Sequence, residues 1–425
     1  MIHKIIFNKM NNKKILAIII ILALILRIIF ALIVPIFEKP DENAHFEYIQ
    51  FVAENKKLPV QTKDDIHAEF FQPPFYHYFS SFILRFIKTF TQDLSYQVIS
   101  MRLVSIFISI VTLLTIYKMA SLIFKNSNLV LGIVAFAAFL PSHININSSV
   151  TNENFADFLT TLIIYLLLLF IVKSENYKNI ILLGIITGIS LITRLSIIPV
   201  IATIPFAFTV KYYPNIKKAV KPVVLIAIIA LLISSWLFAR NLNLYGDILG
   251  INAMKLASPP EEIKVNLAFA ARLAGWTFIT FWASFGRTND IFIGNLTSQS
   301  GIATFFLSYS LLLLFSIGAV FGLYIFFKNY RKNKNILSNN QKKSFIIVLF
   351  HLALLSLIFL SFNFYDFQPQ GRLFFSAIST ISIFFTFGIY NLLSLYNKIR
   401  LFLPVCLILF ILMDIASIIS VVRHY

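Results

Sequence analysis

Two neighbouring acids near the start of the chain are the first residues whose type and spacing point to chemistry. Asp41 and Glu42 stand where a helix along a membrane surface is expected to begin. A carboxylate beside a helix N-terminus can stay ionised at neutral pH, so it can deprotonate a hydroxyl or bind a cation that grips a phosphate. The structural alternative is that Asp41 caps the helix and Glu42 complements its dipole.

Other polar residues follow in the same stretch. His45 lies four residues after Asp41 and can share its helix face, where a hydrogen-bonding role is more frequent than metal ligation. Gln72 opens a Gln-Pro-Pro turn, which is extended and rigid, and an apolar segment at 78–87 then predicts a second surface helix.

Three later segments bring more polar residues toward the membrane boundary. Asn152 and Glu153 end a short loop, and Asp157 is expected one helical turn deeper. Gln370 precedes Gly371 and Arg372, and an arginine there can hold a phosphate or simply reach the interface. Arg240 and Tyr245 open another loop, where cations beside aromatic residues also suit the headgroup region.

The elements that must position these residues are membrane helices. Of all residues, 58% are hydrophobic and 13% are charged, which excludes a soluble globular protein. The net charge of +18 does not indicate nucleic-acid binding, because the Lys and Arg residues are spread over short loops between apolar runs. The single cysteine, Cys406, excludes an internal disulfide.

The apolar runs predict an all-α, polytopic protein of about eleven transmembrane helices in one domain, residues 1–425. The first run is expected to be an uncleaved anchor. The runs span 15–37, 98–117, 129–145, 154–172, 179–193, 195–210, 222–239, 302–327, 344–362, 373–396 and 401–422. The fifth and sixth are too short for two full spans and are expected to meet around Thr193, Arg194 and Ser196.

Charge then predicts the orientation. With a basic, cytoplasmic N-terminus, the inner segments hold most Lys and Arg residues and one acid, Glu175, while nearly all other acids lie outside, as the positive-inside rule requires. Two large outer loops result, at 38–97 and 240–301, and the first is expected to carry the surface helices. The plasma membrane is the expected location, with the active face extracytoplasmic.

In order along the chain, several of these motifs resemble those of the GT-C membrane glycosyltransferases. The similarity is to the protein-mannosyltransferase and aminoarabinose-transferase type (family 39) and to bacterial relatives of these enzymes. It rests on the motifs at 40–48, 72–76, 151–153, 240–241 with 245–247, 281–282 with 285–286, and 370–372. The resemblance implies sugar transfer from a polyprenyl-phosphate carrier to a lipid, glycan or protein acceptor.

The resemblance also implies residue roles. Asp41 matches the acid of the first outer loop, and a single displacement assisted by this base would invert the anomeric centre. Glu42 would assist Asp41, and Glu42 and Glu153 would orient the phosphate, the acceptor or a divalent cation, while Arg372 would neutralise the phosphate. The other substrate-binding residues expected in these motifs are His45, Gln72, Asn152, Arg240, Tyr245 and Gln370.

Two other functional classes stay open at this point. A transporter or lipid flippase would carry charged residues at mid-membrane, and Arg27 and Asp414 are such residues, although a salt bridge between the first and last helices would also explain them. A non-catalytic scaffold would use the outer loops to bind a partner.

Overall fold

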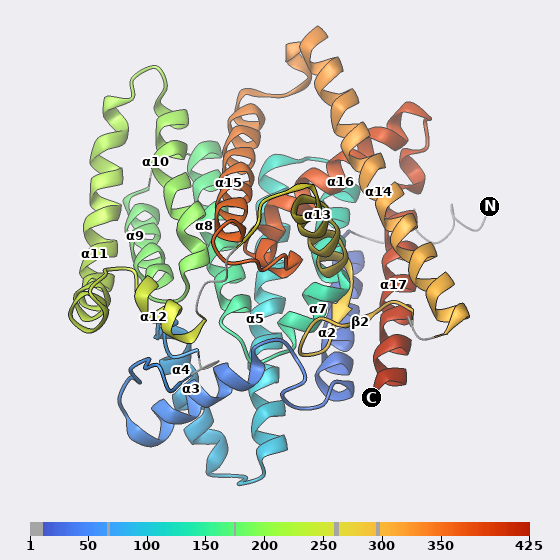
Figure 1. Ribbon diagram of the computed structural model, residues 1–425. Coiled ribbons are helices and arrows are strands. Elements are labelled where there is room, and N and C mark those ends of the chain that lie inside the picture. Colours follow the sequence, from blue (N-terminus) through green and yellow to red (C-terminus); the bar gives the residue numbers. More distant parts are fainter. Residues whose placement is uncertain (1–11, 66–68, 174–175, 259–262, 295–297) are drawn as a thin grey trace.

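The computed structural model describes residues 12–65, 69–173, 176–258, 263–294 and 298–425. Most of these residues form helices, which pack into a single bundle (Figure 1). The longer helices are α2 (Asn12–Ile33), α5 (Leu94–Ile123), α8 (Glu153–Val172), α11 (Lys217–Tyr245), α14 (Gln299–Lys332), α15 (Asn339–Asn363), α16 (Ile378–Leu395) and α17 (Phe402–His424). The shorter elements are α3 (Glu42–Asn55), α4 (Phe75–Lys88), α6 (Ser127–Ala138), α7 (Pro141–Asn147), α9 (Tyr177–Leu191), η1 (Leu195–Ile197), α10 (Ile198–Tyr212), α12 (Ile251–Ala257), α13 (Leu267–Trp282), η2 (Lys334–Ile336), η3 (Gly371–Ala377) and η4 (Ile399–Leu401).

All eleven predicted apolar runs form helices. Within the described residues, nine are long and apolar enough to cross a membrane, and the bent pair α6 and α7 makes a tenth if it is counted as one span. The eleventh run corresponds to α9, which has 15 residues and is shorter than a full span. The chain is therefore a multi-pass membrane protein, and the predicted fold class is confirmed.

Two interruptions in the spans have local causes. The axes of α6 and α7 differ by 62°, and Leu140 between them is extended because Pro141 follows it. The predicted meeting of two shortened helices is also confirmed, since α9 ends at Leu191 and Arg194 is extended before η1 begins. This second break leaves Arg194 beside the start of α8, where it donates to Asn152 and Glu153.

The segment between α2 and α5, predicted as the first outer loop, contains the two expected helices, α3 and α4, at one end of the bundle (Figure 1). Helix α4 exposes Phe79, Phe82 and Phe86 along one side. An exposed apolar side suits contact with lipid, and we therefore interpret α4 as a helix on the membrane surface. Helix α5 begins four residues before its predicted start, because the Asp93 carboxylate caps it by accepting from the Ser95 and Tyr96 amides.

The segment between α11 and α14, predicted as the second outer loop, contains an apolar helix, α13, that the sequence did not predict. Its run is interrupted by Arg272 and Gly275. After α13 the chain forms a short antiparallel pair, β1 (Ser284–Phe285) with β2 (Ile291–Phe292). Together with η3, helix α13 closes one side of the site described below.

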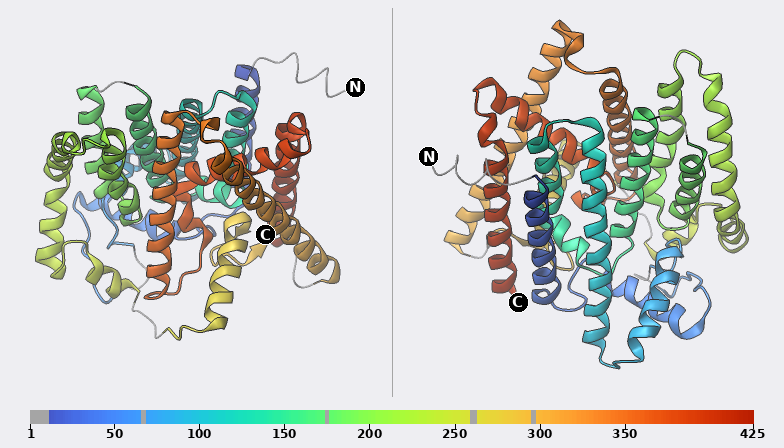
Figure 2. Two further views of the ribbon diagram at one scale, coloured as in Figure 1. Left: turned by 90° about the horizontal axis from the view of Figure 1, so that it is seen from above. Right: turned by 180° about the vertical axis from the view of Figure 1, so that it is seen from behind.

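Close helix crossings and a buried arginine shape the bundle interior. Helices α14 and α16 cross at Gly322 and Gly388, where a Cβ on either glycine would overlap the backbone of the other helix. Helices α2 and α17 lie side by side at one edge (Figure 2). The expected salt bridge between them does not form: Arg27 donates to Ser109 and to the Ala138 carbonyl, and both Asp414 oxygens lack a hydrogen-bond partner among the described residues.

Candidate active site

Asp41 lies immediately before α3, but its side chain does not cap that helix. Its φ of 56° places it in the left-handed region, which aspartate tolerates better than most residues. No hydrogen bond joins its carboxylate to the helix end, so the capping alternative is wrong for this residue. Instead, Oδ2 accepts from Nη2 of Arg372 at 2.7 Å, and 40% of the side chain is exposed. The carboxylate is thus held by an arginine and still open to a reactant.

Arg372 is aimed by three acceptors. Its Nε donates to Gln370 (2.5 Å), Nη1 to Glu153 (3.1 Å) and Nη2 to Asp41 (2.7 Å), and only 9% of the side chain is exposed. The preceding Gly371 lets η3 approach α13 closely, because a Cβ there would overlap the backbone of Phe281. A planar guanidinium held in this way has a fixed direction, which a lysine ammonium would lack.

Glu153, at the first turn of α8, binds both Arg372 and a second arginine, Arg194. Its Oε1 accepts from Arg372 and also from Nη2 of Arg194 at 2.9 Å. Arg194 donates its Nη1 to the side-chain carbonyl of Asn152 at 2.6 Å. We call Asp41, Glu153, Arg194 and Arg372 the arginine–carboxylate cluster. With both acids ionised its formal charge is zero, so an arriving phosphate would compete with the carboxylates for the arginines.

Two polar bridges extend from the cluster to another acid. Asn152 donates to Gln72 at 3.3 Å, and Gln72 donates to Glu69 at 2.7 Å. Burial and the neighbouring charge of Asp41 raise the pKa of Glu69 to about 7. Burial alone would raise the pKa of Asp41 too, but Arg372 and two further arginines outweigh it and lower that pKa. The site therefore pairs an ionised acid with one that titrates near neutral pH.

Glu42 is next to Asp41 in sequence and is placed very differently. Its side chain is 0% exposed and forms a salt bridge with Arg102, with distances of 2.8 Å to Nε and 2.5 Å to Nη2. Its oxygens also accept from the backbone amides of Phe37 and Val150. With both oxygens occupied, Glu42 ties the start of α3 to α5 and is not available to assist Asp41 or to bind a cation.

We expect Glu42→Gln to lower the thermal stability of the protein in detergent. The neutral amide leaves Arg102 as an uncompensated buried charge, which costs about 3–5 kcal/mol. Glu47→Gln, an exposed substitution on the same helix, should leave the melting temperature unchanged. Unchanged stability of Glu42→Gln together with lost activity would instead give Glu42 a chemical role.

His45 faces another histidine. Its Nδ1 lies 2.9 Å from Nε2 of His77, and the His77 ring stacks on Tyr48 with centroids 4.0 Å apart. Burial, together with the charges of Arg194 and Arg372, lowers the pKa of His45 well below its usual value. One ring must donate to the other, so Nδ1 of His45 is occupied. The contact joins α3 to α4, which favours a structural role for His45. Contact of His45 with substrate stays a proposal.

Arg240 and Tyr245, at the end of α11, lie apart from the cluster. Arg240 donates to the Pro59 carbonyl at 2.5 Å, and the Tyr245 hydroxyl accepts from the Gln61 amide at 2.9 Å. Both residues fasten the first outer loop to the end of α11. The expectation that they bind substrate is not supported by these contacts.

The carboxylates of Glu42 and Glu153 do not together fit a divalent cation. Arg102 and backbone amides occupy Glu42, while two guanidiniums approach Glu153 and would repel a metal ion. Within the described ranges, no three His, Cys, Asp or Glu side chains are close enough to hold a metal together. We therefore derive no step through a bound cation.

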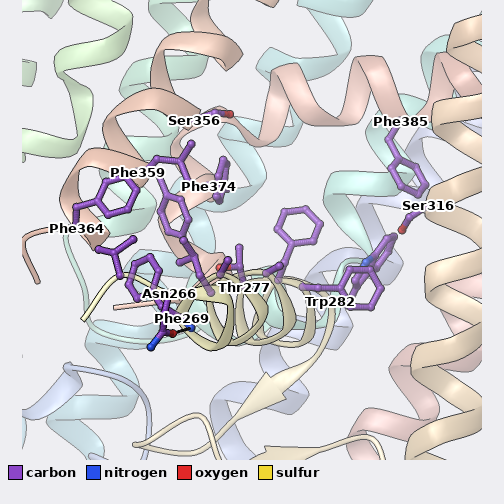
Figure 3. Close-up of a pocket in the computed structure, with 17 residues that line it drawn as sticks. Asn266, Phe269, Thr277, Trp282, Ser316, Ser356, Phe359, Phe364, Phe374 and Phe385 are labelled. Atoms are coloured by element: carbon purple, nitrogen blue, oxygen red, sulfur yellow. Dashed lines mark hydrogen bonds between the residues drawn. The ribbon is translucent and has the colours of Figure 1, made fainter. Parts of the chain in front are cut away.

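The structure also contains an apolar groove (Figure 3). Its volume is about 680 Å³, and it lies between α13, η3 and the membrane helices α14 and α15. Phe374 in its wall is two residues from Arg372 in η3, and Phe281 in its wall packs on Gly371. One wall of the groove is therefore η3, the element that also carries Arg372. Its lining includes Phe269, Leu273, Ala274, Phe278, Phe359 and Phe374.

The structure brings together five of the predicted site positions around Arg372. It adds one arginine and one acid that the sequence had not assigned to the site. Asp41, Glu153 and Gln370 contact Arg372 directly, and Asn152 with Gln72 forms the next layer. Arg194 and Glu69 were missed. The break between two short apolar runs was a signal for Arg194, whereas no spacing in the sequence singled out Glu69.

Comparisons with known proteins give the following similarities. The family model described as dolichyl-phosphate-mannose-protein mannosyltransferase matches residues 72–238. No curated protein matches the sequence. Among solved structures, ArnT from Cupriavidus metallidurans bound to undecaprenyl phosphate has a TM-score of 0.58 at 10% identity, covering 96% of this chain and 76% of ArnT.

Two structures of the Archaeoglobus fulgidus oligosaccharyltransferase are also similar. The complex with Zn and sulfate has a TM-score of 0.54 at 14% identity, covering 94% of this chain and 53% of that one. The AglB complex with an inhibitory peptide and a dolichol-phosphate has a TM-score of 0.54 at 11% identity, with coverages of 96% and 55%. This chain thus spans about half the length of the oligosaccharyltransferase, and the similarity concerns the fold.

Proposed function

We propose that the chain is a membrane glycosyltransferase of the GT-C type and that it transfers a sugar from a polyprenyl-phosphate carrier to an acceptor hydroxyl. The matching family model and the similar solved structures support this proposal. The acceptor is a lipid, a glycan or a protein. The reaction takes place on the extracytoplasmic face of the plasma membrane, and the N-terminus is cytoplasmic. The observation that carries this proposal is the arginine–carboxylate cluster, which shares the element η3 with the wall of an apolar groove.

The chemistry follows from the positions of Asp41 and Arg372. The acceptor oxygen bonds to the anomeric carbon while the bond from that carbon to the phosphate oxygen breaks, and Asp41 takes the acceptor proton. The carrier phosphate leaves with the negative charge, which Arg372 and Arg194 stabilise. One displacement of this kind inverts the anomeric centre. The arginines therefore stabilise the additional negative charge that the phosphate gains as the bond breaks.

Asp41 can act as a base only when Arg372 no longer neutralises it. In the present arrangement Arg372 uses three of its five N–H groups on protein acceptors, one of them Asp41. The carrier phosphate would compete for the same guanidinium and release Asp41 toward the acceptor. Gln370 and Glu153 keep the arginine in place, and Asn152 with Gln72 forms a second layer of contacts around the cluster.

The groove suits the carrier tail because aromatic and aliphatic side chains line it and few polar groups interrupt them. Phe374 in its wall is two residues from Arg372, so we expect a tail in the groove to leave its phosphate within reach of the cluster. The similar ArnT and AglB structures hold undecaprenyl phosphate and dolichol-phosphate, which supports a lipid carrier of this class.

Filling the groove should weaken the use of long carriers. We expect Ala274→Trp to raise KM for a long polyprenyl-phosphate donor about tenfold, since an indole occupies volume that the tail needs. Ala271→Trp, one turn earlier on α13 and outside the groove lining, is the matched control. The measurement is the KM for donors of several chain lengths in proteoliposomes. An equal rise for the shortest and longest donors would argue against tail binding here.

Glu69 should set the acidic limb of the pH profile. Protonation of Glu69 below about pH 7 removes a negative neighbour of Asp41, which makes Asp41 a weaker base. We therefore expect the transfer rate to rise as pH increases through 7. Glu69→Gln should be slower and should lose this limb. A native profile that is flat between pH 6 and pH 8, roughly one unit on each side of this pKa, would contradict the assignment.

The proposal as a whole is tested by transfer of labelled sugar in proteoliposomes. Purified protein is supplied with a panel of polyprenyl-phosphate sugars and with lipid, glycan and peptide acceptors. Turnover that requires both the carrier and an acceptor hydroxyl is the expected result. No transfer with any combination, while the protein remains folded, would contradict the proposed function.

A further inference from the structure

A small cavity lies beneath the arginine–carboxylate cluster, on the side facing the membrane helices. Glu153 and Asp157, one turn apart on α8, line it together with Arg194, Arg372 and Ser376. Its volume is about 10 Å³, which is roughly the space one water occupies. Asp157 is only 2% exposed, and none of the roles proposed above uses it.

The acids around this cavity have unused oxygens. Oε2 of Glu153 and Oδ2 of Asp157 are buried without a hydrogen-bond partner in the described part of the chain, while Oε1 of Glu153 accepts from both arginines. Two carboxylates this close cannot both ionise cheaply, so one of them is expected to hold a proton. Glu153 is the ionised member because the arginines already bind it.

His143 on α7 supplies the partner for that proton. Its Nδ1 lies 2.8 Å from the Ala137 carbonyl, which can only accept, so Nδ1 carries hydrogen. In a neutral ring Nε2 then presents its lone pair, and it lies 3.5 Å from Oδ2 of Asp157. Two lone pairs at this distance would repel each other. A single proton between them removes the repulsion.

The charges around the pair place the proton on the aspartate. Arg27 donates to the carbonyl of Ala138, next to the one that His143 uses, so its positive charge opposes a charged imidazole. Glu153 opposes a charged Asp157, whereas Arg194 and Arg372 would favour it but are already bound to Glu153. The neutral pair is therefore favoured.

We propose that His143 and Asp157 share one proton that keeps Asp157 neutral, and that Asp157 is thereby a positioning residue for Arg194 and Arg372. An ionised Asp157 would draw both guanidiniums inward to the cavity and away from Asp41. A neutral one leaves them directed outward, where the carrier phosphate is expected. The functional part of this inference rests on the proposed glycosyl transfer, but the protonation state does not.

Infrared spectroscopy of the full-length protein with ¹³C-carboxyl-labelled aspartate tests the protonation state directly. The native protein should show a protonated carboxyl band that moves on labelling and is missing from D157N. In His143→Leu this band should shift to higher wavenumber, because the acid loses its acceptor. No label-sensitive band lost in D157N, or a band that ignores His143→Leu, would overturn the sharing of a proton. The melting temperature shows that each variant is folded.

The positioning role is tested by the pH profile of transfer. Loss of the shared proton at alkaline pH should pull the arginines inward in the native protein and slow it, whereas D157N cannot ionise. The ratio of the rate at pH 9.5 to that at pH 7.5, roughly two units apart, should therefore be higher in D157N than in the native protein. Equal ratios would overturn the positioning role. If the native protein transfers no sugar, the proposed function fails while the infrared result still decides the proton.

Discussion

Asp41→Asn should reduce sugar transfer by about 10²- to 10⁴-fold, the range expected when a general base is removed. The asparagine keeps the size of the side chain and can still accept from Arg372, so the fold should persist. It cannot take a proton from the acceptor hydroxyl. The measurement is initial rate against donor concentration in proteoliposomes, and the loss should appear in kcat more than in KM, because Arg372 still meets the phosphate.

Asp64→Asn is the matched control, since Asp64 is an exposed acid in the same outer loop. It should transfer sugar at the native rate. Full activity in Asp41→Asn would remove Asp41 as the base and direct attention to Glu69, the other acid beside it. Equal losses in both variants would indicate a general effect of loop charge on the reaction.

The membrane architecture was predictable because it depends on patterns that are local in sequence. Each apolar run had to satisfy its own backbone hydrogen bonds in lipid, so it became a helix. Helix α13 was not predicted, because Arg272 and Gly275 interrupt its apolar pattern. The bend between α6 and α7 also has a local cause, Pro141, but the pattern of apolar residues does not predict the angle between the two helices.

The site was predictable only in part, because neighbours in sequence receive different environments. Asp41 and Glu42 look equivalent as a pair of acids, yet one meets Arg372 at the mouth of the site and the other is buried against Arg102. That division depends on Arg102 of α5, a residue that the sequence presents simply as one cation in an apolar helix. The sequence therefore predicted a catalytic role for Glu42, which its buried salt bridge with Arg102 does not support.

Long-range contacts explain the other differences. Arg240 and Tyr245 were expected in the site because they follow a membrane helix on the outer side, and the structure places them against Pro59 and Gln61. Arg194 lies in the site because it stands in the break between α9 and η1. From there its side chain reaches Asn152 and Glu153 at the start of α8. Which arginine reaches which acid is decided by helix packing, and sequence spacing carries little information about it.

Arg372→Lys should lower kcat/KM for the carrier by about 10²- to 10³-fold, the effect of removing one well-placed donor from a developing anion. Arg372 binds Asp41, Glu153 and Gln370 in three fixed directions. A lysine offers one flexible ammonium, so it cannot satisfy these acceptors and orient a phosphate at the same time. Initial rates against donor concentration and binding of sugar-free polyprenyl phosphate should both show the loss.

Arg331→Lys, an exposed exchange of the same kind at the far end of α14, should leave both measurements unchanged. The comparison separates geometry from charge, because both substitutions keep the net charge of the protein. If Arg372→Lys retained native transfer, a positive charge at this position would be sufficient and the three-way orientation would be incidental. If it bound polyprenyl phosphate normally but transferred slowly, Arg372 would act on the leaving phosphate during the reaction, and Arg194 would be the residue that holds the carrier at rest.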